Sequence, residues 1–339
     1  MRTLIVSDLH LGSRLRRDVL RQAGPRRVLL DAVAEADRLV LLGDVVELLE
    51  GRPEDAMAVA EPILRAIGQA AGKGREILVV PGNHDHALVR PWLRARRAQS
   101  APLGLATRVA TTSGPELEAL SGWLRAGGAR VRVQYPGAWL REGTIYLHHG
   151  HYLDRHLAST NRSEVLVNPD AYEMAPVASL AALQGMISTT LPSSVARPLD
   201  RAASFARIAG LAAAPMAAQM VGMGTIAPLG ASALNLQFRR RGLPAMHEVL
   251  RRFEVHADHA VFGHVHRAGP APDDDREEWV SPTGPDLHNS GSWVYEPLLL
   301  AGAAPPHPYW PGGAVLIEGD APPRQLRLLD DLPVHALTP

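Results

Sequence analysis

Five short apolar runs of strand length, each ending in Gly, Asp, Asn or His, constrain the fold of this chain most strongly. The runs are continuous, not alternating, which is the pattern of strands buried on both faces. Helices are expected over about 16–36 and 54–71, between the first three runs, and this alternation predicts an α/β fold with a layered sheet. The runs lie at residues 3–8, 38–44, 76–85, 144–151 and 259–266.

The polar residues that end these runs are expected to meet at one site. In open α/β sheets, ligands bind in the crevice at the carboxyl ends of the strands. Side chains from five separate strand ends should therefore converge there. In chain order the ends carry Asp8 and His10 in SDLH, Asp44 in GD, Asn83, His84 and Asp85 in GNHD, His149 in HGH, and His264 and His266 in GHVH.

The residue types at these ends predict a metal site. The sequence has no cysteine, which excludes disulfides, thiolate nucleophiles and thiolate metal ligands. Carboxylates, neutral imidazoles and one amide oxygen suit two hard or borderline cations. One carboxylate can bridge both ions at about 3.5–4 Å, the separation used in two-metal phosphoryl hydrolysis. A single D-x-H or GD is common in ordinary strand-end turns, so the prediction depends on all five motifs together.

The five motifs, in this order, resemble those of the calcineurin-like metallophosphoesterase superfamily, from residue 1 to about 295 apart from an insertion. The resemblance implies one domain over residues 1–339 with a four-layer α/β/β/α sandwich and a dinuclear centre at the strand ends. It implies that Asp44 bridges the two ions. It implies the remaining ligands to be Asp8, His10 and His266 for one ion and Asn83, His149 and His264 for the other.

The resemblance also implies a catalytic pair beside these ligands. His84 matches the family's non-ligand histidine next to the scissile phosphate, and Asp85 is expected to orient it. Two divalent ions, with Mn favoured over Fe, Zn and Ni, would neutralise the phosphoryl oxygens and lower the pKa of a bound water to supply hydroxide. A protonated His84 could donate to the leaving oxygen. The expected activity is that of a metal-dependent phosphoesterase.

The segment from about 152 to 257 is expected to form a helical insertion or cap. It is rich in Ala and includes an amphipathic helical pattern over 245–256. Residues 208–238 carry no charged side chain and are long enough to span a bilayer. Proline and glycine interrupt them, however, so a buried helical pair or an apolar cap is favoured.

The substrate is the least constrained part of the prediction. SDLHLG, GDVVE and the insertion resemble the UDP-2,3-diacylglucosamine diphosphatase branch, whose members cover a lipid substrate with a helical cap. That branch usually has arginine at the position of His84. A phosphorylated small-molecule or lipid-linked substrate is expected, as either a diphosphate or a phosphodiester, with peripheral membrane contact through 208–238. The location is expected to be cytoplasmic, because no signal-like segment precedes the first strand.

Two other classes of function remain as alternatives. A nuclease or cyclic-nucleotide phosphodiesterase is possible on this chemistry, but a nuclease should carry a basic stripe with stacking aromatic residues. The net charge of zero and the 5% aromatic content argue against specific nucleic-acid binding. A non-catalytic scaffold would lose metal ligands, and every expected ligand is in place. No obligate protein partner is implied.

The sequence LHHGH at 147–151 holds three candidate histidines. Along a strand, Leu147 and His149 share one face and His148 the other. His149 is therefore the expected ligand, His148 a packing residue, and His151 a loop residue at the rim of the site.

Polar residues near the motifs have two interpretations each. Glu47 is interpreted as a first-turn helix residue, stabilised by the helix dipole, in preference to a wall of the site. His86 is consistent with either a substrate contact or a solvated loop. Asn289 and Ser290 are expected to support the metal-site loop. Three arginines after the first motif could hold a phosphate, although exposed helix arginines are the commoner case: Arg14, Arg16 and Arg17.

Overall fold

A computed structural model describes most of the chain. The described ranges are residues 1–158, 167–173, 235–236, 238–281, 284–300 and 302–338. The strands are β1 (Arg2–Val6), β2 (Arg38–Leu42), β3 (Glu76–Val80), β4 (Ala106–Val109), β5 (Arg130–Leu140), β6 (Ile145–His148), β7 (His259–Phe262), β8 (Ala268–Gly269), β9 (Asp286–Ser290), β10 (Gly313–Glu318) and β11 (Arg324–Arg327). The helices of the described ranges are α1 (Ala23–Ala34), α2 (Pro53–Ala71), α3 (Arg90–Ala98), α4 (Pro115–Leu124), α5 (Asp154–Ala158), α6 (Pro169–Glu173), α11 (Leu243–Arg252) and α12 (Pro297–Leu300).

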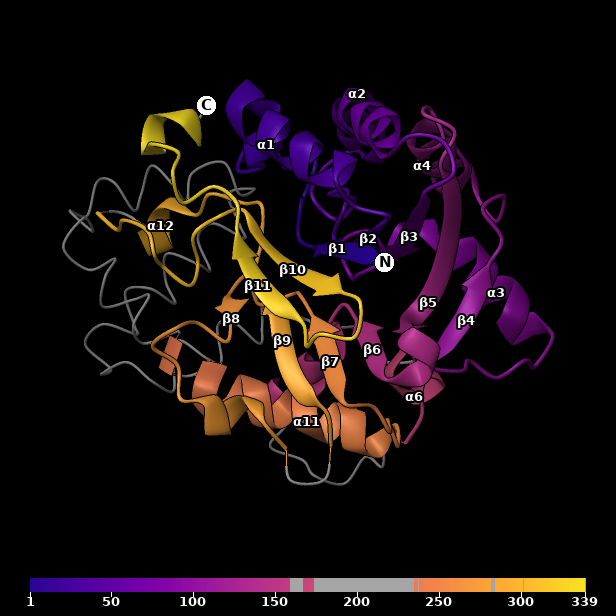
Figure 1. Cartoon of the computed structure of the whole chain (residues 1–339). Helices are drawn as coiled ribbons and strands as arrows, with labels where there is room; N and C mark the ends of the chain where they lie inside the picture. The colour runs from indigo at the N-terminus through magenta and orange to yellow at the C-terminus, as the bar shows by residue number, and fades with distance from the viewer. Residues whose placement is uncertain (159–166, 174–234, 237, 282–283, 301, 339) are drawn as a thin grey trace, which may run out of the picture.

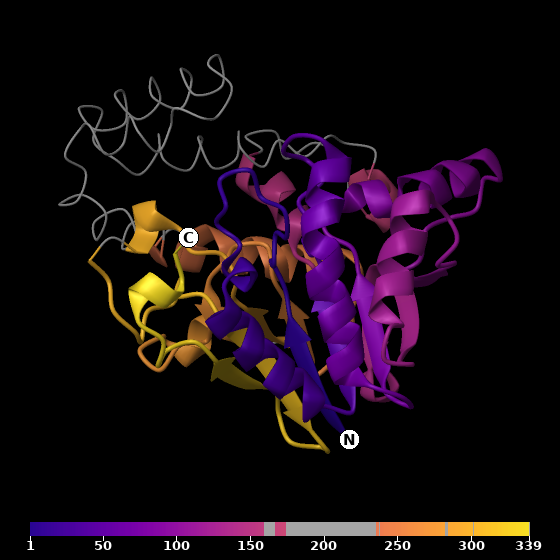
Figure 2. The ribbon, with the colours of Figure 1, turned by 90° about the horizontal axis from the view of Figure 1, so that it is seen from above.

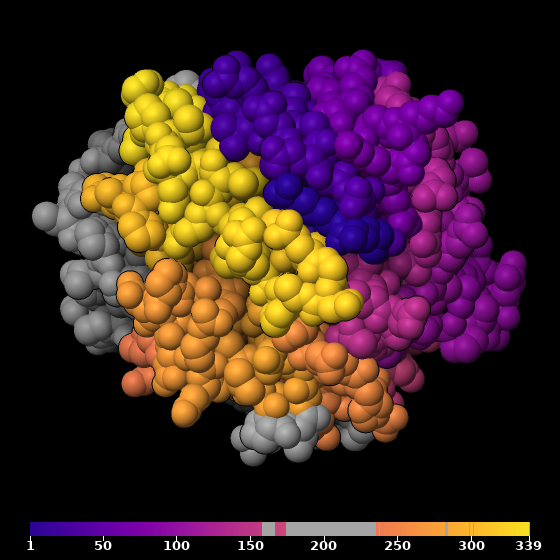
Figure 3. Space-filling model, viewed as in Figure 1, coloured from indigo at the N-terminus to yellow at the C-terminus, as the bar shows by residue number. Residues whose placement is uncertain are grey.

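One long strand, β5, belongs to two sheets. The strand order is β11-β10-β1-β2-β3-β5-β6-β7-β9-β8, with β4 also paired to β5. The first part of β5 runs parallel to β3, with Val133 opposite Val79, and its second part runs antiparallel to β6, with Leu140 opposite Ile145. β10 pairs antiparallel with β1, so the C-terminal and N-terminal segments lie side by side on one face (Figure 3).

Three apolar clusters separate four layers. Ile5 and Val40 of the first sheet pack with Leu147 and Val261 of the second in a cluster between the sheets. The outer face of the first sheet packs against α1, α2 and α4, and the outer face of the second against α11. These helices lie above and below the strands in Figure 1, and α1 and α2 lie side by side over the sheet (Figure 2). The α/β/β/α order that the resemblance implies is confirmed.

The apolar runs form strands because alternate residues enter different clusters. In β1, Leu4 and Val6 face the outer helices and Ile5 faces the second sheet. Each of the five runs contains a strand of four or five residues. The strands β1, β2 and β3 are parallel neighbours, and so are β6, β7 and β9. The five polar strand ends therefore lie at carboxyl ends, as the sequence predicts.

Two parts of the chain differ from what the sequence suggests. The helix expected over 16–36 begins only at Ala23, after a 3-10 turn over Val19–Arg21, because the buried Asp18 carboxylate accepts the Gly12 N–H and pairs with Arg21, which holds the preceding residues in a turn. The stretch 269–286, whose Pro and Asp content is typical of an exposed loop, contains the buried Trp279.

The predicted cap falls largely outside the described ranges. Its described parts include α5, α6 and α11, whereas residues 174–234, which hold most of the uncharged stretch 208–238, are not described. Within the described ranges, no helix is long and apolar enough to cross a bilayer.

Candidate metal centre

The candidate ligands lie in loops that follow the carboxyl ends of five strands. Two of these loops bond directly to each other: Asp8 N–H donates to Gly43 O at 3.0 Å, and His10 N–H to Asp44 O at 2.8 Å. The third contact crosses between the sheets, since His264 N–H lies 3.0 Å from Asp8 Oδ2. Backbone bonds thus gather the two sheets around one site.

Five candidate ligands have left-handed backbone conformations. For most L-residues this region costs roughly 1–2 kcal/mol each, and Asp and His tolerate it better than most. Five such positions still hold backbone strain of a few kcal/mol, a sizeable part of the net stability of a domain. Strain of this kind persists only where the surroundings hold it, and it clusters at functional sites. The φ angles are 54° at Asp8, 44° at His10, 52° at Asp44, 70° at His264 and 56° at His266.

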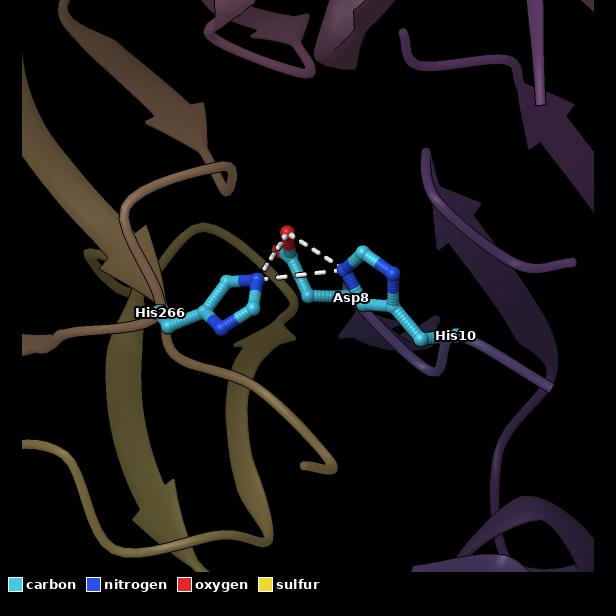
Figure 4. Close-up of side chains that lie close together, drawn as sticks. All are labelled: Asp8, His10 and His266. Carbon is cyan, nitrogen blue, oxygen red and sulfur yellow. Dashed lines mark hydrogen bonds and ion pairs between the residues drawn. The ribbon is translucent and has the colours of Figure 1, made fainter. Parts of the chain in front are cut away.

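The first group of ligand atoms comes from Asp8, His10 and His266 (Figure 4). Nε2 of His266 lies 3.4 Å from Asp8 Oδ1 and 3.1 Å from Nε2 of His10. Burial alone would raise the pKa of Asp8, but His149 and His266 outweigh it and hold the pKa below its ordinary value. A carboxylate and two imidazoles thus face one point.

The second group comes from Asp44, His149 and His264, whose ligand atoms lie within 4.8 Å of one another. Nδ1 of His149 donates to Leu42 O at 2.9 Å, which leaves the lone pair on Nε2, 3.1 Å from Asp44 Oδ2. This tautomer is the one that a metal ligand needs, because the second ring N–H is fixed by a carbonyl.

Asp44 lies between the two groups. Its Oδ2 is 3.7 Å from Nε2 of His10 and 3.1 Å from Nε2 of His149, while its Oδ1 accepts the His84 N–H at 2.8 Å. The oxygen placed to serve both groups is therefore Oδ2. Two glycines make this approach possible: a Cβ on Gly82 would lie 2.3 Å from Asp44 Oδ1, and one on Gly43 would lie 2.2 Å from His149 Nδ1.

The donor set fits divalent cations. Both polar side-chain atoms of Asn83 and Nε2 of His149 are buried without a hydrogen-bond partner. Buried polar atoms normally have partners, and converging lone pairs need a positive centre. Carboxylate, imidazole and amide ligands together match Mn²⁺, Fe²⁺ or Zn²⁺ chemistry. The predicted residues are thus brought together in a form that suits metal.

Glu47 is a site residue that the sequence interpretation missed. It precedes α2 and does not lie in a helix. Its buried carboxylate lies 2.9 Å from Nδ1 of His10 and 2.7 Å from Nδ1 of His84. Burial would raise the pKa of Glu47, but the bonds from His10 and His84 outweigh it and lower the pKa to about 2. Its position three residues after Asp44 is the sequence signal for the alternative interpretation, a polar wall of the site.

The His84 ring is held by Glu47 and not by Asp85. Both Asp85 oxygens accept backbone N–H groups instead, from Gly82 at 2.6 Å and Val45 at 2.8 Å. Burial would lower the pKa of His84, but the Asp44 and Glu47 carboxylates outweigh it and raise the pKa to about 9. Asp85 therefore shapes the loop, and the orienting contact predicted for it belongs to Glu47.

Replacing Glu47 with glutamine is expected to lower turnover by roughly 10- to 100-fold, since partners of metal-site histidines typically contribute that much. Both imidazoles bond Oε2 of Glu47, while Oε1 accepts two backbone N–H groups. The amide keeps the size of the side chain, but it removes the negative charge and places an NH₂ group against one of these two sets of donors. The matched control is Glu50→Gln, three residues further along. Steady-state kinetics of the two purified variants give the turnover numbers to compare. Equal turnover of the two variants would contradict a role for the contact of Glu47 with His10 and His84.

The remaining candidate residues differ in how well their positions match the roles predicted for them. His151 is buried, and its pKa is lowered well below the ordinary value by burial, so it is not a rim residue. His148 is also buried, and its Nδ1 accepts the Gly150 N–H. Asn289 and Ser290 bond the backbone of Gly263 and Phe262 and thus support the loop of the last motif, as predicted.

Two further contacts lie near the candidate ligands. Nε2 of His264 lies 3.0 Å from Asp154 Oδ1, a carboxylate that the sequence interpretation did not single out. The arginines after the first motif lie in a loop and not in a helix, and one of them, Arg17, pairs with Glu296.

Comparison with protein families decides the class of this site. The sequence profile of the family described as calcineurin-like phosphoesterase matches residues 1–176, which is 176 of the 339 residues. The chain belongs to the calcineurin-like phosphoesterase family. This phosphoesterase is therefore a metal-dependent phosphoester hydrolase, with candidate ligands clustered as that chemistry requires.

Other comparisons add little to this assignment. No curated protein matches this phosphoesterase. Similar solved structures include a cold-active protein-tyrosine phosphatase of a psychrophilic Shewanella species, with 14% identity and a TM-score of 0.32, covering 94% of this chain and 76% of that chain. Another structure of a cold-active protein tyrosine phosphatase has 12% identity and a TM-score of 0.29, covering 94% and 73%. Such low values support no argument about fold or activity.

Proposed function

We propose that this protein hydrolyses phosphoesters at a dinuclear metal centre. The observation that carries the proposal is the position of Asp44 Oδ2 between two groups of ligand atoms. Asp44 would bridge the ions. The first ion would be held by Asp8, His10 and His266, and the second by Asn83, His149 and His264.

The protein's own residues would complete the chemistry. When bound, two divalent ions neutralise phosphoryl oxygens and lower the pKa of water, which supplies a nucleophile at neutral pH. Glu47 occupies Nδ1 of His84, so Nε2 is the nitrogen left to donate a proton to the leaving oxygen. Asp85 holds the Gly82 and Val45 amides and so keeps the loop that carries His84 in place.

The proposed substrate is a lipid-linked or nucleotide diphosphate or phosphodiester, and Mn²⁺ is the favoured ion. The likeness of SDLHLG, GDVVE and the insertion to the diacylglucosamine diphosphatase branch supports the lipid-linked form. Such a substrate would bring the enzyme to a membrane surface from the cytoplasm, with contact through 208–238, most of which lies outside the described ranges.

Metal-free protein is expected to bind two Mn²⁺ per chain and to gain hydrolase activity toward a chromogenic phosphodiester. Elemental analysis gives the stoichiometry, and a chelator should abolish turnover. A substrate screen with lipid-linked diphosphates, nucleotide diesters and sugar phosphates then identifies the class. Protein that binds no Mn²⁺ at neutral pH, or that stays inactive with it, would contradict the proposal.

A further inference from the structure

Two buried charged side chains, Glu173 and Arg267, join the insertion to the loops that carry candidate ligands. On the insertion side the contacts involve Glu173, the last residue of α6, and Asn235, which precedes α11. Glu173 bonds His86 and Asn235 bonds Arg267, and each of these partners directly follows a metal-site motif. We call these contacts the entry clamp, centred on Glu173, and the exit clamp, centred on Arg267.

The entry clamp ties α6 to the GNHD loop. Only 4% of the Glu173 side chain is exposed, and its carboxylate accepts hydrogen bonds from His86 Nε2 at 2.9 Å, from Tyr152 OH at 2.6 Å and from Tyr135 OH. His86 follows Asp85 directly, so the clamp acts on the loop of Asn83 and His84. Burial would raise the pKa of Glu173, but these three donors hold it below its ordinary value. The carboxylate is therefore a fully satisfied, charged anchor.

The neighbourhood of α6 supports the entry clamp. Asp170, on the same short helix, accepts the Leu103 N–H at 2.8 Å. Tyr135 lies on β5, and Tyr152 directly follows His151. Glu173 at the end of α6 therefore contacts the strand that joins the two sheets, the residue after the HGH motif and the residue after the GNHD motif.

The exit clamp ties the residues after 234 to the GHVH loop. Arg267 follows His266 directly and is 1% exposed. Its guanidinium donates to Asn235 Oδ1 at 2.6 Å, pairs with the buried Asp274, and lies 5.4 Å from the ring centre of Phe238. Trp279 packs on the same guanidinium, with its ring centre at 5.3 Å. An arginine packed against two aromatic rings and bonded through its planar fork cannot be replaced by lysine without loss.

We infer that Glu173 and Arg267 are positioning residues for the phosphoesterase reaction, through which α6 and the residues that precede α11 order the two metal-binding loops. Neither side chain forms a hydrogen bond or ion pair with a candidate ligand among the described residues. Glu173 acts through His86, which follows the GNHD motif. Arg267 acts through its position directly after His266. The inference rests on the proposed function, because it takes Asn83, His264 and His266 as ligands.

The entry clamp is tested with Glu173→Gln in the full chain loaded with Mn²⁺. Turnover of a chromogenic phosphodiester is expected to fall about 10-fold, with KM within two-fold and two Mn²⁺ retained, which is the scale typical of groups that orient a metal site. His86→Gln should give an equal or smaller loss, and the double variant should lose no more than Glu173→Gln alone, because both variants break the contact between Glu173 and His86. Glu118→Gln, an exposed carboxylate of α4, is the matched control and should match wild type.

The exit clamp is tested by metal affinity. Arg267→Lys is expected to weaken Mn²⁺ binding about 10-fold in a calorimetric titration, while Arg94→Lys, an exposed arginine of α3, should leave it unchanged. Asn235→Ala and Tyr152→Phe each remove a single bond, and they replace the stronger variants if those fail to fold. Asn235→Ala should weaken Mn²⁺ binding and Tyr152→Phe should lower turnover, each by a smaller factor than the variant it replaces.

The possible outcomes separate this inference from the proposed function. If wild type neither binds Mn²⁺ nor hydrolyses the ester, the proposed function fails. If wild type does both, and folded clamp variants match it in turnover and affinity while only their melting temperature falls, the clamps are structural and the inference is wrong. Multiplicative losses in the Glu173 and His86 double variant would also overturn it.

Discussion

Replacing Asp44 with asparagine is expected to reduce the bound Mn²⁺ from two per chain to one or none and to lower turnover by about 10³-fold or more. The carboxylate is the one group whose oxygen lies near both sets of ligand atoms. Its loss removes charge stabilisation of several kcal/mol from the transition state, and each 1.36 kcal/mol corresponds to a factor of ten.

Asparagine is the suitable replacement because it tolerates the left-handed conformation at position 44, where φ is 52°. The fold should therefore survive, and its melting curve in the absence of metal serves as the check. Asp31→Asn, on the exposed face of α1, controls for the loss of one negative charge. Elemental analysis and steady-state kinetics give both readouts. A variant that kept two ions and near-normal turnover would refute the bridging role.

Replacing His84 with alanine is expected to lower turnover by about 10²- to 10⁴-fold, the usual contribution of a general acid, with metal content unchanged. Its Nδ1 is bonded to Glu47, so the ring is oriented by a carboxylate and not by the ligand set. A competing possibility follows from geometry, since His84 also lies with His10 and Asp44 in a group able to hold an ion.

Two measurements distinguish these roles for His84. If the ring donates a proton to the leaving oxygen, the loss should be small for a nitrophenyl ester, whose leaving group needs little help, and large for an alkyl ester. If it is a ligand, Mn²⁺ content should fall and both esters should suffer equally. His256→Ala, at an exposed position, is the control for loss of an imidazole.

The parallel strands and their polar ends could be predicted from the sequence because both depend on local pattern. The run 38–44 reads as a buried strand followed by a turn, and β2 ends at Leu42, just before Asp44. The long strand β5 was not predicted. Its first half alternates Arg with Val, and Pro136 and Gly137 interrupt its centre, so its period changes where it passes from one sheet to the other.

Contacts made across the fold could not be predicted either. Glu47 and His84 are distant in sequence, and their contact exists only because β2 and β3 are neighbours. The clamp residues are hidden for the same reason: nothing local in the sequence pairs Glu173 with His86 or Arg267 with Asn235. The left-handed backbone at Asp8 and His10 follows from bonds between loops, not from their own residue types.

The left-handed positions also bear on how this activity would be lost in descent. At each of them glycine fits the backbone better than the residue that selection has kept, because glycine lacks the Cβ that makes this region costly. A change of His10 or His266 to glycine would therefore remove a ligand and relieve about 1 kcal/mol of backbone strain. At Asp8 and Asp44 the same change would also leave the His264 and His84 N–H groups, which these carboxylates accept, without a partner. Descendants that abandon catalysis should therefore show glycine or asparagine at positions 10 and 266 before they show glycine at positions 8 and 44.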